Sequence, residues 1–195
     1  MGLIKTPLDD LTYRVNGLAM AVQGELKRGH RERVYQQYLR ERISNIALRV
    51  EFEPRIDVYT GTALLGYMYL DLWVERSVIV ECKAFDHLLT NEDVGQVITY
   101  LVATGNSVGL LYNFGRMKLE FKRILPPKSV QEWQQHLYRS VWIPRGHALP
   151  PVETVPLSSL RFFVDGQPLT PVFATSTIDA SSSLIQLSNF NLIEE

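Results

Sequence analysis

The sequence predicts an α/β fold in which helices flank a β-sheet, with a β-hairpin near the C-terminus. Two β-rich runs in the middle of the chain, 67–74 and 78–84, alternate in polarity as strands do. Segments with the 3.6-residue period of amphipathic helices lie before and after these runs. The expected order is α-α-β-β-β-α-β-β, which suits a mixed sheet with helices packed on it.

Two helices are expected in the first part of the chain. A threonine and a proline at 6–7 supply a cap and a first helical position, and Gly29 can end this helix in a left-handed conformation. A second helix is expected to run to about Ile43. It places Glu32 and Tyr35 about one turn apart on a shared face.

Strands and one more helix follow. The expected elements are a strand at 48–59 interrupted by Pro54, a turn at 60–61, the two central runs, a helix from the cap at 90–93 to Gly105, and strands at 107–114 and 117–125. On the helix, Gln96 and Tyr100 lie four residues apart and so project from the same face. From this pattern alone they could be half-buried polar residues where the helix meets the sheet.

The composition changes after two prolines at 126–127, so we divide the chain into a core at 1–126 and an extension at 127–195. The extension is expected to hold a helix to about Ser140, a proline-rich linker, and a hairpin whose strands 160–164 and 169–173 flank a turn. Such an apolar hairpin must pack on the core or pair its edge with another subunit. The second alternative predicts a homodimer.

Composition excludes several classes of protein. No apolar run approaches the length of about 20 residues that spans a bilayer, and the first residues lack a signal-peptide pattern. We therefore expect a soluble cytoplasmic protein with no membrane partner. A single cysteine cannot form an internal disulfide or a thiolate metal cage. The net charge of −1 decides nothing about nucleic acid, because local patches matter more.

The central runs bring acidic and basic residues together. A three-residue loop at 75–77 would pair Leu72 with Val80, Val74 with Val78 and Asp71 with Glu81. One face of this hairpin is then apolar, and its members are Leu70, Leu72, Val74, Val78, Val80 and Cys82. The other face carries Asp71, Glu81 and Lys83, a set that suits Mg²⁺ or Mn²⁺ and a phosphate. The alternative is a surface hairpin with an ordinary solvated ion pair.

The motif Asp71…Glu81-Cys82-Lys83 resembles the signature of the PD-(D/E)XK nuclease superfamily. The wider pattern is similar to the prokaryotic GxxExxY protein family of that superfamily, whose motif matches residues 29–35. Further matches are 71–75, 78–84, 95–101 and 109–115, and the likeness runs from about residue 11 to 125. The chain departs from the family at 22–23 and in the turn 26–29, which bears on substrate preference more than on metal binding.

The resemblance implies an α/β sandwich and a metal-dependent nuclease. The implied metal ligands are Asp71, Glu81, the backbone carbonyl of Cys82, and Glu32 as a further carboxylate. Lys83 would assist the attacking water, and Gln96 and Tyr100, which resemble the Gln-x-x-x-Tyr motif of recombination-type nucleases, would support the site. We expect Mg²⁺ or Mn²⁺ as cofactor and nucleic acid as partner, with DNA preferred. RNA stays open, because metal and phosphate chemistry is common to both polymers.

Basic residues crowd the segment around Glu32. Four of them, Lys27, Arg28, Arg31 and Arg33, are the candidates for tracking a phosphate backbone, and a solvated helix face is the alternative. His30 and His87 fall near motif residues, whereas His136 and His147 do not, and a zinc site is not expected. A rival to the nuclease hypothesis is a non-catalytic nucleic-acid-binding or assembly protein on the same fold.

Overall fold

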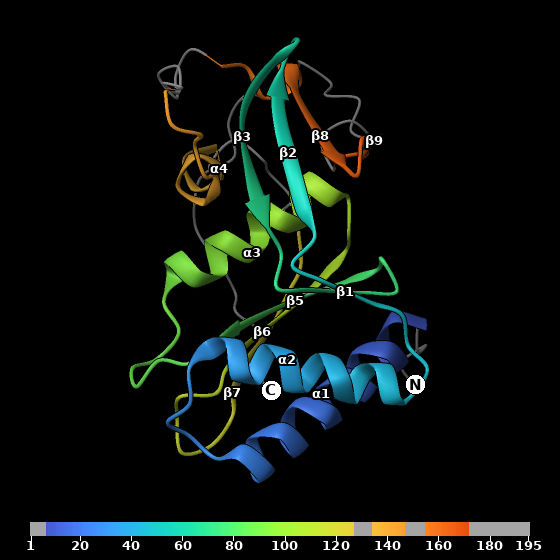
Figure 1. Ribbon diagram of the computed structural model, residues 1–195, viewed down its shortest axis with the longest axis vertical. Helices are drawn as coiled ribbons and strands as arrows, with labels where there is room; N and C mark the ends of the chain where they lie inside the picture. Colours follow the sequence, from blue (N-terminus) through green and yellow to red (C-terminus); the bar gives the residue numbers. More distant parts are fainter. Residues whose placement is uncertain (1–6, 127–133, 147–154, 172–195) are drawn as a thin grey trace, which may run out of the picture.

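The computed structural model describes residues 7–126, 134–146 and 155–171. In chain order its elements are α1 (Pro7–Leu26), α2 (Glu32–Asn45), β1 (Val50–Phe52), β2 (Arg55–Thr60), β3 (Ala63–Tyr69), β4 (Leu72–Val74), β5 (Val78–Lys83), α3 (Asn91–Thr104), β6 (Val108–Asn113), β7 (Glu120–Ile124), α4 (Gln134–Ser140), the short 3-10 helix η2 (Leu157–Ser159), β8 (Leu160–Val164) and β9 (Gln167–Pro168). In Figure 1, α1 and α2 lie at one end of the molecule, and β2 and β3 extend beyond α3 toward the other end. The expected mixed α/β class is confirmed.

The main sheet has five strands in the order β1-β4-β5-β6-β7. Strands β5 and β6 are parallel, and the other neighbours in this sheet are antiparallel. A parallel pair needs a crossover connection, which α3 supplies between β5 and β6. The sheet is therefore mixed, as the sequence predicts.

The predicted pairing of the central hairpin is confirmed within β4 and β5, whereas the expected pair of Asp71 with Glu81 is not part of the ladder, because Asp71 lies at the bend before β4. Leu72 lies opposite Val80, and Val74 lies opposite Val78. Two of the three loop residues, Glu75 and Arg76, have positive φ angles of 51° and 48°. This short loop sets the alignment of the strands, and the alignment determines which side chains face each helix.

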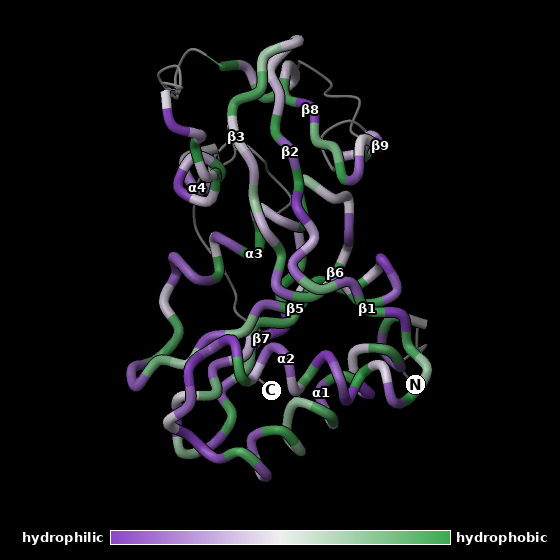
Figure 2. Tube along the Cα trace, in the orientation of Figure 1, coloured by the Kyte–Doolittle hydropathy of each residue, from purple (hydrophilic) through white to green (hydrophobic). Residues whose placement is uncertain are grey.

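One face of the main sheet packs against α1 and α2. Leu72, Val74, Val78, Val80 and Cys82 belong to this core, and helix residues that complete it include Val15, Val22, Tyr35, Leu39 and Ile43. Both helices carry hydrophilic as well as hydrophobic residues along their length, as amphipathic surface helices do (Figure 2).

The prediction that Leu70 shares this face is wrong. Leu70 is fully buried, but in the core on the α3 side of the sheet. The reason is that the chain leaves β3 at Tyr69 and bends at Asp71 before it enters β4, so the strand alternation does not continue through this point. The backbone N–H of Leu70 donates to the carbonyl of Pro54 instead, at 3.2 Å.

The opposite face of the main sheet is also buried. Trp73 and Ile79 lie there in a core that includes Val97 and Leu101 of α3. The expected helix boundaries are confirmed: Thr90 and Asp93 form a reciprocal capping box, and Gly105 ends α3 with a φ of 73°. Glu81 and Lys83 alternate with Ile79 along β5, so they lie on this same face at the end of the strand.

A second sheet lies on the far side of α3. Its strand order is β3-β2-β8-β9, so the hairpin of the C-terminal extension is joined to a hairpin of the first 69 residues. Ile56, Phe162 and Val164 belong to the same core as α3. Of the two alternatives for the apolar hairpin, packing on the core is the one the structure adopts. The division at residue 126 stays a prediction, since both segments share this core.

The C-terminal hairpin is tighter than the sequence predicts. Only Asp165 and Gly166 form its turn, with φ angles of 49° and 74°, as a two-residue hairpin turn with left-handed residues requires. The second strand begins at Gln167 rather than Leu169. The expected strand residues 172–173 and the cap of the helix before residue 140 lie outside the described residues.

The first helix also ends earlier than expected. Its last residue is Leu26, and Lys27 takes the left-handed conformation at φ 60° that the sequence assigned to Gly29. Gly29 has a positive φ of 106°, but it lies in the loop that leads to α2. Among the described residues, no helix has the length and apolar character needed to cross a membrane.

Candidate active site

The carboxylates and the lysine that the sequence singles out meet at one end of the main sheet. Glu81 and Lys83 lie two residues apart at the end of β5 and project from the same face of the sheet. Asp71 lies at the bend before β4. An oxygen of the Asp71 carboxylate accepts the backbone N–H of Cys82 at 2.7 Å. This bond fixes Asp71 beside β5, next to the two residues that flank Cys82.

A chain of hydrogen bonds connects the sheet to α3. The Lys83 ammonium donates to the Glu81 carboxylate at 2.8 Å and to the Gln96 side-chain oxygen at 3.0 Å. The Gln96 amide nitrogen donates in turn to the Tyr100 hydroxyl at 2.7 Å. The four-residue spacing of Gln96 and Tyr100 thus lets Gln96 connect Lys83 to Tyr100, and the structure brings together these four predicted residues.

Glu32 approaches the same site from α2. It is the first residue of that helix and is half-buried, and it accepts a hydrogen bond from Gln36 at 3.3 Å. The Gln36 side chain also lies near enough to the Asp71 carboxylate to lower its pKa. Gln36 therefore links two of the predicted acids, although sequence reasoning missed it. Its position four residues after Glu32 was the available signal.

Tyr35 has a structural role in this arrangement. Its hydroxyl donates to the carbonyl of Lys27 at 2.8 Å and accepts the N–H of His30 at 3.3 Å. Its ring is fully buried and stacks on Phe114, with ring centres 4.8 Å apart. Tyr35 thereby holds the loop between α1 and α2, and this loop sets where Glu32 begins its helix.

Asn113 is a second residue that sequence reasoning missed. It is fully buried at the end of β6, and its side-chain oxygen accepts the N–H groups of Phe85 and Gly115 at 2.9 and 3.1 Å. Its side-chain nitrogen donates to the carbonyl of His87 at 2.9 Å. Asn113 therefore fixes the loop that follows Lys83. The backbone of this loop approaches Gly115 so closely that a Cβ there would lie 2.2 Å from the carbonyl oxygen of Phe85.

Within the part of the chain that the structure describes, the site holds more buried acidic groups than positive charges to balance them. Burial raises the pKa of Glu81 to about 8, and the charge of Asp71 adds to the effect. Burial likewise raises the pKa of Asp71 to about 6, although the N–H of Cys82 partly offsets this. Burial also raises the pKa of Glu32, although the positive charge of Lys83 partly offsets this.

Lys83 remains a cation at neutral pH. Burial alone would lower its pKa, but the negative charge shared by the adjacent acids Glu81, Glu32 and Asp71 more than compensates, so that the pKa is raised overall. A lysine in this state donates hydrogen bonds and supplies positive charge. It does not take up a proton from water until it has first lost one.

Comparison with known proteins agrees with this geometry. The model of the PD-(D/E)XK nuclease superfamily matches residues 9–124, which contain all of the residues described above. The chain belongs to the PD-(D/E)XK nuclease superfamily. Searches of curated proteins and of solved structures give no match. The superfamily assignment covers α1 through β7 and leaves α4, β8 and β9 outside the matched region.

Nucleases of the PD-(D/E)XK superfamily generally use divalent metal ions, and one feature of this site fits such an ion. The second carboxylate oxygen of Glu81 is buried and has no hydrogen-bond partner among the described residues. A buried carboxylate oxygen of this kind calls for a ligand. Carboxylate oxygens also match the preference of Mg²⁺ and Mn²⁺.

The structure does not gather the complete ligand set that the resemblance implies. Within the described residues, no three side chains of Asp, Glu, His or Cys surround a point where one ion could sit. Magnesium commonly binds through one or two carboxylates and keeps several waters, so Asp71 and Glu81 are sufficient in number. The Cys82 thiol is excluded as a ligand, because burial raises its pKa well above the ordinary value and it packs in the core.

The four candidate nucleic-acid-binding residues differ in their surroundings. Lys27, Arg28 and Arg31 are exposed in the loop before α2. Arg33 instead forms an ion pair with Glu53 at 2.6 Å, and its guanidinium lies over the ring of Phe52 at 5.4 Å. The first three remain candidates for phosphate contacts, whereas the contacts of Arg33 stabilise the junction of α2 with the segment after β1.

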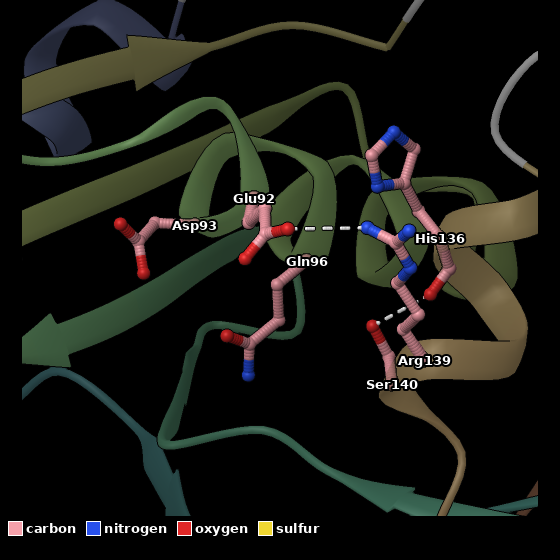
Figure 3. Close-up of a pocket in the computed structure, with 6 residues that line it drawn as sticks. All are labelled: Glu92, Asp93, Gln96, His136, Arg139 and Ser140. Carbon is pink, nitrogen blue, oxygen red and sulfur yellow. Dashed lines mark hydrogen bonds and ion pairs between the residues drawn. The ribbon is translucent and has the colours of Figure 1, made fainter.

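A pocket of about 330 Å³ opens beside Gln96. It lies between α3 and α4, and its lining residues are Glu92, Asp93, Gln96, His136, Arg139 and Ser140 (Figure 3). Sequence reasoning placed His136 away from the motif residues, but the fold brings it to α3. The absence of a side chain at Gly95 makes this possible, because a Cβ there would lie 2.4 Å from a ring nitrogen of His136.

Proposed function

We propose that this protein is a metal-dependent nuclease that hydrolyses phosphodiester bonds, with DNA as the preferred substrate. The observation that carries the proposal is the buried chain Glu81–Lys83–Gln96–Tyr100 beside Asp71. A folded domain tolerates buried acids with raised pKa values only at a cost in stability, and functional sites are where such arrangements concentrate. Membership of the nuclease superfamily supports the same conclusion.

In this proposal Asp71, Glu81 and the backbone carbonyl of Cys82 would hold Mg²⁺ or Mn²⁺, and Glu32 would add a carboxylate. When bound, the ion would supply the positive charge that offsets the charge of the phosphate and acidifies a water molecule. Lys83 would donate a hydrogen bond to the attacking water or to a phosphate oxygen, since its ammonium is charged and held by two acceptors. Gln96 and Tyr100 would keep the ammonium in position.

The direct test measures cleavage of single-stranded DNA, duplex DNA, branched DNA and RNA with Mg²⁺ or Mn²⁺. Cleavage that depends on the ion and stops with EDTA supports the proposal, and cleavage that persists in EDTA contradicts it. If the protein binds nucleic acid but cleaves none of these substrates, the non-catalytic binding protein is the better description. The lack of a three-side-chain ligand cluster among the described residues is the observation that favours this second candidate.

Replacing Gln96 with leucine is expected to lower kcat about 10- to 100-fold with little change in KM. Leucine removes the acceptor that, with Glu81, orients the Lys83 ammonium, so a catalytic group loses its position while the substrate-binding surface stays. Gln37→Leu, on the exposed side of α2, is the matched control and should leave both constants unchanged. An effect confined to KM would assign Gln96 to substrate binding instead.

Replacing Arg28 and Arg31 together with glutamine is expected to weaken binding of all nucleic-acid sequences by a similar factor. Each exposed cation that contacts a phosphate releases counterions, so the slope of log K against log salt should fall by roughly 1 to 2. Binding curves at several salt concentrations measure this slope. Arg40→Gln and Arg49→Gln, both exposed and outside the loop, serve as controls. An unchanged slope in the Arg28/Arg31 variant would show that Arg28 and Arg31 are solvated surface residues that contact no phosphate.

Two finer assignments also remain proposals. Within the superfamily, we propose that the chain belongs to the GxxExxY family, since Gly29, Glu32 and Tyr35 occupy the loop and helix that lead into the site. A homodimer is the second assignment. Because β8 pairs with β2 of the same chain, any subunit contact through this sheet would have to use an outer strand or a face. Sedimentation of the full chain measures the state directly.

A further inference from the structure

The outer face of the second sheet is rich in aromatic side chains. Residues directly opposite one another on antiparallel strands share a face, and the pairs Arg55–Tyr69, Asp57–Tyr67, Asp57–Phe163 and Tyr67–Trp142 place these residues together. We call this set the aromatic face: Tyr67, Tyr69, Trp142 and Phe163, with Arg55 beside them. The inner face of the same strands is buried against α3 and includes Ile56, Val58, Met68, Phe162 and Val164.

Three rings of the aromatic face, those of Tyr67, Tyr69 and Trp142, lie in contact. Tyr67 lies 4.7 Å from Trp142 and 5.5 Å from Tyr69, measured between ring centres. The guanidinium of Arg55 lies over the Tyr67 ring at 4.3 Å. Backbone hydrogen bonds of 3.0 and 2.7 Å between Tyr67 and Trp142 hold the segment after α4 against the edge of β3. These contacts give the rings a fixed arrangement.

Two of these rings remain open to solvent. Trp142 is 54% exposed and Tyr69 is 48% exposed. Cross-strand aromatic pairs stabilise a sheet, which accounts for the contacts of Tyr67. Stabilisation of the sheet does not account for the exposure of Trp142 and Tyr69, which leave about half of their surface in water. Exposed aromatic surface of this kind is typical of binding sites.

The charge of the face favours a polyanion only modestly. Arg55 is exposed and forms an ion pair with Asp57 at 2.6 Å, so part of its charge is balanced. Arg161, opposite Tyr59 on the same face, is also exposed. A surface with this balance gains more from ring stacking than from phosphate contacts. It therefore favours a strand with unpaired bases over a duplex, which presents mainly its phosphate backbone.

The aromatic face adjoins the candidate active site along the chain at two points. Tyr69 precedes Asp71 by two residues, so their Cα atoms can be at most about 7 Å apart. Trp142 follows Ser140 by two residues, and Ser140 lines the pocket beside Gln96 (Figure 3). The Tyr69 end of the aromatic face is therefore the end that lies close to Asp71, and the Trp142 end lies close to the pocket beside Gln96.

We propose that the aromatic face binds the unpaired bases of a single-stranded nucleic acid by stacking and leads that strand to the active site. Every base has a π-face, so this recognition does not depend on the base sequence. The alternative, that the face is buried in a contact between subunits, can be distinguished by experiment. The second half of the proposal rests on the proposed nuclease function. The first half, binding of unpaired bases, does not.

The test measures binding of 15-nucleotide oligo-dT, oligo-U and a DNA duplex of equal length by fluorescence anisotropy in EDTA, so that nothing is cleaved. Tyr69→Ala and Trp142→Ala are each expected to raise the Kd for the single strands about tenfold, and for the duplex less than twofold. Tyr69→Phe and Trp142→Phe keep a ring and should retain the wild-type Kd. Tyr13→Ala, on α1 and 80% exposed, is the control for loss of an exposed aromatic residue.

The outcomes separate the two proposals. If the alanine variants bind single strands as the wild type does, or lose duplex and single-strand binding equally, the stacking proposal is wrong while the nuclease proposal stands. Wild-type protein that binds no single strand overturns it as well. If the wild type sediments as a dimer and the alanine variants sediment as monomers, the aromatic face is a subunit contact. That result would also overturn the stacking proposal. Base stacking with no cleavage under any condition would leave the binding proposal intact and remove the nuclease. Because an alanine variant that fails to fold would mimic the effect, melting curves accompany each variant, and the phenylalanine pair decides any ambiguous case.

Discussion

Lys83→Met is expected to lower the rate of metal-dependent cleavage about 10²- to 10³-fold while the protein still binds nucleic acid. Methionine keeps the length of the side chain but removes the only ammonium in the Glu81–Lys83–Gln96 chain. A preorganised charge aimed at a developing anion typically contributes an effect of this size. Single-turnover cleavage measures the chemical step, and anisotropy in EDTA measures binding separately.

The matched control is Lys122→Met, the same substitution on the edge strand β7. It should leave cleavage unchanged. If Lys83→Met cleaves at the wild-type rate, Lys83 is a structural partner of Glu81, and the proposed role of the ammonium is wrong. Loss of cleavage together with loss of the folded state would decide nothing about chemistry, so Lys83→Arg, which keeps the charge with a different shape, is compared in the same assay.

Glu81→Gln is expected to stabilise the metal-free protein at pH 8 by on the order of 3 kcal/mol relative to the wild type. Burial raises the pKa of Glu81 from 4.5 to about 8, so the folded protein keeps a proton that the unfolded chain releases. Between these two values the unfolded state binds fewer protons, and the free energy of unfolding of the wild type therefore falls as pH rises. Glutamine has nothing to release and avoids this loss.

Urea unfolding in EDTA at pH 5, 6.5 and 8 measures the effect. The two proteins should be closest in stability at pH 5 and diverge toward pH 8. Adding Mn²⁺ should then raise the melting temperature of the wild type much more than that of the variant, because a ligand of the folded state stabilises by mass action. Glu41→Gln, at an exposed position on α2, is the control and should follow the wild-type curve at every pH. Parallel curves for Glu81→Gln and wild type would show that Glu81 is not a destabilising buried acid.

Local pattern was enough to predict the centre of the site. The alternation of Leu72, Val74, Val78 and Val80, with a three-residue loop between the runs, determines the pairing of β4 with β5. Because side chains alternate at a period of two, this pairing also decides that Glu81 and Lys83 share a face. The four-residue spacing of Gln96 and Tyr100 determines a second shared face in the same way. Short-range periodicity carries this information without any knowledge of the rest of the fold.

The surroundings of the site depended on contacts between distant parts of the chain. Gln36 reaches Asp71, and Asn113 fixes the loop after Lys83, but neither side chain belongs to a pattern that marks it as special. Alternation also failed at Leu70, where the chain passes from one sheet to the other and the period is interrupted. Such residues are selected by what packs against them.

By itself the sequence determined the helices of the core, the pairing of β4 with β5, and the shared face of Glu81 and Lys83, because these follow from periodicity and one short loop. The runs expected at 48–59 and 67–74 are each divided between the two sheets, and Asp71 reaches the site from the bend in the second of these runs. Only the tertiary structure decided that β8 pairs with β2, that α4 brings His136 to Gln96, and that Trp142 lies opposite Tyr67. Each of these contacts joins residues at least 40 positions apart in the chain. Contacts of this kind form wherever burial of the whole core is greatest, and local alternation does not encode that choice.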